Sequence, residues 1–218
     1  MTREELEALA ARTVAHYDAE AVAFEAGTRD HDVSQNRAAL LDAIERDAGE
    51  GDVRALALLD LGCGPGRDLA HFRSLGHEAI GLDGSARFVE MARAQTGCEV
   101  LHQSFLALAL PPARFDGIFA NASLFHVPTP ELPRVLAQLE ATLRPGGVLF
   151  CSNPHGPDVE SVSGGRYGAF HSLETWRKYV TAAGFIELDR YYRPPGRPRR
   201  EQPWLATVWR KAGEPISR

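Results

Sequence analysis

The sequence predicts an α/β fold with a doubly wound sheet of seven strands, preceded by an N-terminal helical extension. Two observations carry this prediction. From residue 55 onward, short apolar runs alternate with amphipathic helical patterns five times, and two further strand patterns end the chain. Alternating strands and helices form a mainly parallel sheet with helices on both faces. With 218 residues, 44% of them hydrophobic, the chain can bury such a core as one domain.

Residues 1–52 are expected to form a helical cap, and residues 53–218 the core. Apolar residues at helical spacing predict a first helix over residues 4–24. One face of this helix carries Leu6, Leu9, Thr13 and Tyr17. A second helix is predicted over residues 33–48, with Asp32 as its N-cap and with Gly49 and Gly51 after its end. The polar segment GTRDHDVSQN, residues 27–36, joins the two helices.

The core begins with ALALLDLG, whose nearly continuous apolar run is typical of a strand that is buried on both faces. Four more strands are predicted at HEAIGLD, CEVLHQS, FDGIFANA and RPGGVLFCSN. Helical spacing of apolar residues predicts the intervening helices over residues 67–75, 85–95 and 130–143. Ser172 is expected to cap a further helix that ends at Gly184. FIELDRYY and PWLATVWR complete the sheet as a final hairpin.

Composition argues against several classes of protein. The net charge is −5, with both signs spread along the chain, so neither nucleic acid nor an anionic membrane is expected as the main partner. No apolar run approaches the roughly 20 residues of a membrane span. The three cysteines, without a secretory signal at the N-terminus, favour a reducing cytoplasm. Neither CxxC nor HExxH occurs, so no metal site is expected.

The first strand-to-helix turn, LLDLGCGPGRD, carries the strongest functional signal. Its glycines allow a sharp turn and a close approach of a ligand to backbone amides. Asp83 ends the second strand, where an acidic side chain can accept hydrogen bonds from both ribose hydroxyls. A dinucleotide site would require GxGxxG, whereas this turn is GxGxG followed by Arg67 and Asp68. Asp60, two residues before the first glycine, suits a ligand with a free amino group better than a pyrophosphate.

The glycine turn, Asp83, FDGIFANASLFH and LRPGGVLF occur in this order, and together they resemble the class I S-adenosylmethionine-dependent methyltransferases over about residues 55–210. The resemblance implies a Rossmann-like fold and S-adenosylmethionine as cofactor. It implies that the methionine part contacts Asp60, Gly62, Cys63, Gly64 and Gly66. Asp83 would hold the ribose, with Gly84 and Ser85 beside the adenosine. An acidic residue usually meets the adenine amino group, but this chain has Ser104 and Phe105 there. Asn121 would face the sulfonium, and Tyr17 could reach the methionine carboxylate.

The flanking segments indicate a narrower group. YDAEAVAFEAGTRDHDVSQNRAALLDAI, RYGAFHSLETWRKYVTAAGF and YYRPPGRPRREQPWLATVWRK resemble the C-terminal methyltransferase domain of the ovothiol-biosynthesis enzymes, or a stand-alone form of it. That resemblance implies methylation of the π nitrogen of the imidazole of 5-thiohistidine, giving ovothiol A. It also implies functional partners in a sulfoxide synthase and a lyase of the same pathway, since 218 residues leave no room for the iron-dependent synthase itself.

Candidate residues for the acceptor lie outside the glycine turn. His126, in NASLFHVP, is the best candidate for a catalytic polar role, and its alternative is a helix-capping or exposed histidine. Tyr167 and His171 could line the same mouth or simply pack in a loop. An amino-acid acceptor brings a carboxylate and an ammonium group. Arg29, Asp30 and Asn36 in the polar segment, and Arg193 near the C-terminus, could bind these groups or be solvated.

Two other functions compete with the first hypothesis. The same fold could methylate another small polar acceptor. The chain could also be a catalytically idle module that binds S-adenosylmethionine or its product. The intact glycine turn, Asp83 and the polar cap argue against the idle module.

Overall fold

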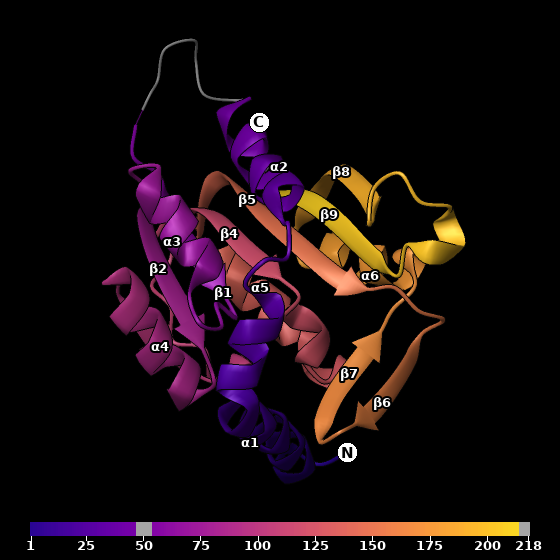
Figure 1. The fold of residues 1–218 in the computed structure, drawn as a ribbon. Coiled ribbons are helices and arrows are strands. Elements are labelled where there is room, and N and C mark those ends of the chain that lie inside the picture. Colours follow the sequence, from indigo (N-terminus) through magenta and orange to yellow (C-terminus); the bar gives the residue numbers. More distant parts are fainter. Residues whose placement is uncertain (47–53, 214–218) are drawn as a thin grey trace.

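A computed structural model describes residues 1–46 and 54–213 and contains the predicted sheet (Figure 1). Its seven strands lie in the order β3-β2-β1-β4-β5-β9-β8. β1 to β5 are parallel, and β9 runs antiparallel to both β5 and β8. The strands are β1 (Ala57–Leu61), β2 (Glu78–Asp83), β3 (Val100–His102), β4 (Phe115–Asn121), β5 (Leu143–Pro154), β8 (Phe185–Arg193) and β9 (Trp204–Lys211). The predicted Rossmann-like fold class is therefore confirmed.

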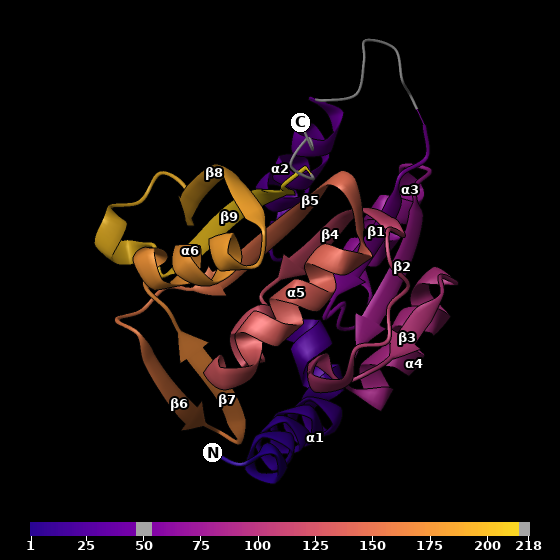
Figure 2. The same cartoon turned by 180° about the vertical axis from the view of Figure 1, so that it is seen from behind.

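Helices cover both faces of the sheet, as Figures 1 and 2 show from opposite sides. One face packs against α2 (Ser34–Glu45), α3 (Arg67–Ser74) and α4 (Ala86–Thr96). The other packs against α5 (Leu132–Thr142) and α6 (Leu173–Ala182). Every residue of β1 is buried, which explains its continuous apolar run. As predicted, the Ser172 hydroxyl caps α6 by accepting a hydrogen bond from the Thr175 amide.

The N-terminal helices have different places in the fold. α1 (Arg3–Thr28) is longer than predicted and contacts α4 and β7. α2 packs on the sheet and buries Leu40 and Ala43 in the core. Its N-cap position is Val33 rather than the predicted Asp32, although the Asp32 carboxylate still accepts from the Ser34 amide at 2.9 Å. The predicted end of this helix, and the expected cap boundary after residue 52, lie outside the described residues.

A two-stranded hairpin that the sequence did not predict lies between β5 and α6. It is formed by β6 (Val159–Ser163) and β7 (Arg166–Phe170). All five residues of β6 are exposed, so the strand lacks the apolar alternation on which strand prediction depends. The signal that was present is the Gly164–Gly165 turn. Both glycines have positive φ, 58° and 82°, as a tight hairpin turn requires. β7 lies beside α1 (Figures 1 and 2).

Asp116, at the start of β4, joins the amino ends of three neighbouring strands. Its carboxylate accepts from the Ala57 amide of β1 at 2.8 Å, and from the guanidinium groups of Arg54 and Arg144. Burial alone would raise the pKa of Asp116, but these hydrogen bonds outweigh it and lower the pKa to about 2.

Among the described residues, no helix has the length and apolar character needed to cross a membrane.

Replacing the carboxylate of Asp116 tests whether its hydrogen bonds with Arg54 and Arg144 stabilise the fold. Since the pKa of Asp116 lies below its usual value of 3.8, its contribution to stability is present above about pH 4 and is lost as the pH falls toward 2. We expect Asp116→Asn to lower the free energy of unfolding by about 1–2 kcal/mol at pH 7, after allowance for the exposed arginines. Urea unfolding at several pH values measures the difference, which should shrink toward pH 3. A difference that is independent of pH would contradict the assignment. The exposed Glu90→Gln is the control.

Candidate active site

The glycine turn after β1 has the backbone conformation that its sequence predicts. Gly62, Gly64 and Gly66 have φ values of 75°, 53° and 97°, which disfavour residues with a Cβ atom. A Cβ at Gly62 would lie 2.5 Å from the Cβ of Ser123, and one at Gly66 would lie 3.0 Å from the Cα of Ala92. Glycine is therefore required at both positions by backbone angle and by packing.

Asp83 connects this turn to the start of α4. One carboxylate oxygen accepts from the Gly64 amide at 2.9 Å, and the other accepts from the Ser85 amide at 2.8 Å. Burial raises the pKa of Asp83, and the hydrogen bonds from the backbone amides oppose that rise. The Ser85 hydroxyl caps α4 by accepting from the Phe88 amide, and donates to the carboxylate of Asp18 on α1. Asp83, Gly84 and Ser85 thus form one rigid corner.

Asp60 is a buried carboxylate with an unpaired oxygen. The residue is 3% exposed, and Oδ2 has no hydrogen-bond partner. Burial, and next the neighbouring Asp68, raise its pKa well above the ordinary value. An unpaired buried acceptor is unfavourable unless a donor reaches it, and a ligand ammonium group would meet that need. Cys63 is also buried, and burial raises the pKa of its thiol, so it contributes backbone and packing rather than a thiolate.

α1 lies over the glycine turn. The rings of Tyr17, Phe24 and Phe88 contact one another, with centroids 5.2 to 5.8 Å apart. A Cβ built on Gly64 would lie 3.8 Å from the ring of Phe24. On the side of β3, a ring atom of Phe105 would lie 3.3 Å from a Cβ on Gly62. Ser104 is exposed, and its hydroxyl accepts from the Leu106 amide.

His126 lies in the turn η2 (Leu124–His126) after β4, and both ring nitrogens have partners. Nδ1 lies 2.6 Å from the carbonyl oxygen of Tyr167, and Nε2 lies 2.8 Å from the hydroxyl of Tyr17. A carbonyl can only accept, so Nδ1 carries the proton and Nε2 accepts from Tyr17. Burial lowers the pKa of His126 to about 4. The hydrogen bond to the Tyr167 carbonyl opposes this decrease, whereas the neighbouring Arg166 and His16 add to it. The ring is therefore neutral near pH 7.

Tyr167 supports this arrangement through its backbone. Its amide donates to the hydroxyl of Thr13 on α1, and its carbonyl holds His126. Its phenol is buried and accepts from the Thr129 amide. Burial raises the pKa of this phenol to about 12, so it stays protonated at neutral pH.

A second hydrogen-bonded chain joins α2 to the end of β4. The amide nitrogen of Asn36 donates to Oδ1 of Asn121 at 2.9 Å. Oδ1 of Asn36 accepts from the hydroxyl of Tyr191 on β8 at 3.0 Å. Asn36 is 2% exposed, so this polar side chain is buried with both amide groups engaged. The structure thus brings together Asn36 and Asn121, which the sequence analysis had assigned to different ligands.

Other sequence-predicted residues take no part in the hydrogen bonds described above for Tyr17, His126, Asn36 and Asn121. Arg29 is exposed and pairs with Glu25 of its own helix, and Asp30 is exposed. A guanidinium nitrogen of Arg193 donates to the backbone carbonyl of Asp32. Both ring nitrogens of His171 are buried without hydrogen bonds, and burial lowers its pKa.

α3, a helix that the sequence predicts, also anchors the polar segment, and this contact is not apparent from the sequence. Arg67 donates to the carbonyl oxygens of Thr28 and His31 at the end of α1. The same arginine pairs with Asp68, which also pairs with Arg37 of α2. These ion pairs attach the connection between α1 and α2 to the helix that follows the glycine turn.

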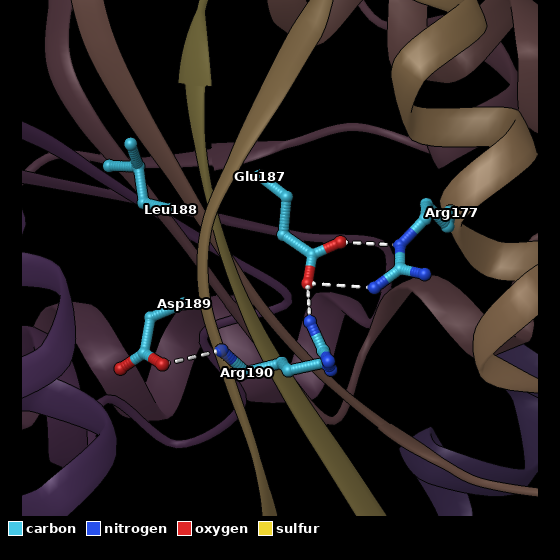
Figure 3. Close-up of a pocket in the computed structure, with 5 residues that line it drawn as sticks. All are labelled: Arg177, Glu187, Leu188, Asp189 and Arg190. Carbon is cyan, nitrogen blue, oxygen red and sulfur yellow. Dashed lines mark hydrogen bonds and ion pairs between the residues drawn. The ribbon is translucent and has the colours of Figure 1, made fainter.

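A polar pocket of about 470 Å³ lies elsewhere, on α6 and β8 (Figure 3). Glu187 accepts from Arg177 and from Arg190 inside it. Its lining residues are Arg177, Glu187, Leu188, Asp189 and Arg190, which include none of the predicted site residues. Because its main charges neutralise one another, we do not assign the active site there. Within the part of the chain that the structure describes, no three His, Cys, Asp or Glu side chains are placed to hold a metal ion.

Comparisons with known proteins bear on these features. A family model described as a methyltransferase domain matches residues 58–147. A trans-aconitate 2-methyltransferase of Azoarcus sp. is 36% identical over 109 residues, which are 49% of this chain and 42% of the relative. A ubiquinone biosynthesis O-methyltransferase of Ruegeria pomeroyi is 35% identical over 163 residues, 67% of this chain and 63% of the relative. The chain thus spans less than two thirds of each curated relative.

The fold is also found in solved structures. The 1,6-didemethyltoxoflavin-N1-methyltransferase of Burkholderia thailandensis, solved with bound 1,6-didemethyltoxoflavin and S-adenosylhomocysteine, is 25% identical. The match covers 91% of this chain and 88% of that one, with a TM-score of 0.65. Residues 58–147 are thus similar to a methyltransferase domain, and the chain has the Rossmann-like fold of S-adenosylmethionine-dependent methyltransferases, which supports S-adenosylmethionine as the cofactor. The relatives act on different acceptors by name, so the acceptor requires separate argument.

The protonation of His126 can be measured directly. We expect ¹⁵N NMR to show a neutral ring at pH 7 with the proton on Nδ1, and a pKa near 4. Tyr17→Phe should raise this pKa, because the Tyr17 hydroxyl stabilises the neutral ring by donating to Nε2. His126→Gln assigns the resonance. A proton on Nε2, or a pKa unchanged in Tyr17→Phe, would contradict the geometry.

Proposed function

We propose that the protein is an N-methyltransferase that uses S-adenosylmethionine to methylate the π nitrogen of the imidazole of 5-thiohistidine, giving ovothiol A. The observation that carries the proposal is that two groups of residues lie next to each other. A glycine turn with Asp60 and Asp83 suits the cofactor, and Tyr17 of the helix over that turn is hydrogen-bonded to a neutral His126, which suits an imidazole acceptor. The resemblance of both flanking segments to the ovothiol-biosynthesis domain supports this acceptor.

The residues at the carboxyl ends of β1 and β2 fit the cofactor. Asp60 has an unpaired buried oxygen that can accept from the methionine ammonium group. Asp83 stands at the position that binds ribose hydroxyls in this fold, and Phe105 lies beside the glycine turn where an adenine ring can pack. When bound, S-adenosylmethionine supplies an electrophilic methyl group on a sulfonium. Tyr17 can turn from His126 to the methionine carboxylate, since its one proton serves one acceptor at a time.

His126 suits an imidazole acceptor because it is neutral. Once Tyr17 releases Nε2, that nitrogen can accept a hydrogen bond from the N–H of the acceptor ring, which leaves the other ring nitrogen with a free lone pair. With a pKa near 4, His126 holds this tautomer rather than removing the proton as a strong base. The nitrogen would take the methyl group as its bond to the sulfonium sulfur breaks, which would leave S-adenosylhomocysteine as a neutral thioether. The methylated ring would then be cationic, and the adjacent thiolate would balance that charge. Placement of nucleophile and methyl can itself supply about 7–11 kcal/mol.

A second candidate is methylation of another small polar acceptor. It is favoured by the names of two relatives, which are methyltransferases for trans-aconitate and in ubiquinone biosynthesis. The Burkholderia relative, by contrast, is named as an N1-methyltransferase and holds a small heterocyclic acceptor, which supports nitrogen as the nucleophile. A catalytically idle binding module remains the third candidate. For Arg29 to reach a ligand, it would have to leave Glu25, and Asn36 already holds Asn121.

Removal of the Asp83 carboxylate tests the cofactor site. We expect Asp83→Asn to weaken binding of S-adenosylhomocysteine by roughly 10- to 100-fold, because the amide is a poorer acceptor for the ribose hydroxyls. Isothermal titration calorimetry gives the dissociation constant, and thermal melting shows whether the variant is folded. Glu78→Gln, at the other end of β2, is the matched control. A folded Asp83→Asn protein with wild-type affinity would remove Asp83 from the site.

Acceptor choice distinguishes the three functions. We expect transfer to 5-thiohistidine with a kcat/KM roughly 10- to 100-fold above that for histidine, because the thiol contributes both binding and charge balance. Mass spectrometry of the product, with fragmentation, identifies the methylated nitrogen. Equal turnover of both compounds favours the second candidate. Tight binding of S-adenosylhomocysteine without transfer to either imidazole favours the idle module.

A further inference from the structure

An arginine without an ion-pair partner lies at the acceptor side of the candidate site. Arg166 is the first residue of β7, directly after the Gly164–Gly165 turn, and its side chain is exposed. Across residues 1–46 and 54–213, no carboxylate forms an ion pair with it. Its guanidinium carbon lies 6.0 Å from the centre of the Tyr17 ring, which keeps the charge beside α1.

The other arginines near the site are engaged. Arg29 pairs with Glu25, and Arg37 and Arg67 both pair with Asp68. Arg193 donates to the backbone carbonyl of Asp32. Of these five arginines, Arg166 is the one whose charge no carboxylate or carbonyl partner satisfies.

The charge of Arg166 acts on the groups at the centre of the site. Burial raises the pKa of Tyr17, and Arg166 opposes that rise. Burial lowers the pKa of His126, and Arg166 and His16 both lower it further. The positive charge of Arg166 therefore lies near a neutral imidazole and beside the Tyr17 ring. A negatively charged ligand is stabilised at such a place.

The strand order separates Arg166 from the strands that carry the residues proposed for the cofactor. Asp83 and the glycine turn belong to β2 and β1, whereas β4 and β5 lie on the other side of β1. His126 follows β4, and β7 follows β5 and contacts both η2 and α1. Arg166 thus belongs to the hairpin that contacts η2, the turn that carries His126, and not to the strands that carry the glycine turn and Asp83.

We propose that Arg166 binds the carboxylate of the acceptor, and that it selects acceptors that carry one. The inference rests on the proposed methyltransferase function and adds a residue for acceptor recognition. A guanidinium can donate two parallel hydrogen bonds to a carboxylate, which fixes the orientation of the amino-acid part as well as its charge. With that end held by Arg166, the imidazole of the acceptor extends toward His126 and Tyr17.

The test compares two acceptors and two arginine variants. We expect Arg166→Met to raise KM for 5-thiohistidine roughly 10- to 100-fold and to leave KM for its decarboxylated analogue, 5-thiohistamine, within about twofold. Arg166→Lys should recover part of the loss, because it restores the charge without the fork of donors. Calorimetric binding of S-adenosylhomocysteine should stay unchanged in Arg166→Met. Arg200→Met, which removes an exposed arginine on η4 (Arg199–Glu201), is the matched control.

The remaining outcomes of this experiment would contradict either the role of Arg166 or the proposed function. Equal losses for 5-thiohistidine and 5-thiohistamine would mean that Arg166 acts through packing against Tyr17. Weaker binding of S-adenosylhomocysteine, with unchanged binding of 5′-methylthioadenosine, would assign Arg166 to the methionine carboxylate of the cofactor instead. Wild-type protein that transfers no methyl group to either acceptor would refute the proposed function. If the wild-type protein transfers the methyl group and the Arg166→Met variant does so with the same KM, only the role of Arg166 is refuted.

Discussion

The carboxylate of Asp83 joins three segments on which the rest of the site depends. By accepting from the Gly64 and Ser85 amides, it links the end of β2, the turn after β1 and the start of α4. A buried carboxylate is unfavourable without such donors, and each charge-assisted hydrogen bond returns about 1.5–3 kcal/mol. Ser85 continues the connection by donating to Asp18, which ties α1 to the same corner. Cofactor residues and the covering helix therefore share one anchor.

Most of the fold follows from local sequence, because strands that are buried on both faces are mostly apolar. β1 and β4 are recognisable for that reason, and Ser172 and Gly184 mark the ends of α6. The β6–β7 hairpin was not predicted, because its exposed strand places no demand on residue type beyond the glycine turn. The start of α2 was misplaced by one residue, since Asp32 satisfies a helical amide from just outside the cap position.

The two halves of the site differ in how far the sequence reveals them. The cofactor half uses backbone conformation and residues close together in the chain, such as Gly62, Gly66 and Asp83, so a short motif contains it. The half that we propose for the acceptor is made of long-range pairs, such as Tyr17 with His126 and Asn36 with Asn121. A charged polar segment suggested Arg29 as a ligand for a carboxylate. Only the folded chain shows that Arg29 pairs with Glu25, whereas Arg166 contacts the Tyr17 ring and forms no ion pair with any described residue. Pairing between distant residues is a property of the tertiary structure and leaves no local pattern.

One helix covers both halves. On the cofactor side Asp18 of α1 accepts from Ser85, and on the acceptor side Thr13 of the same helix accepts from the Tyr167 amide. A ligand that displaced α1 at one half would therefore also shift the groups that the same helix holds at the other half. The two binding equilibria are then linked through a single conformational equilibrium. Whichever ligand binds first changes the affinity for the second by a given factor, and reversing the order gives the same factor.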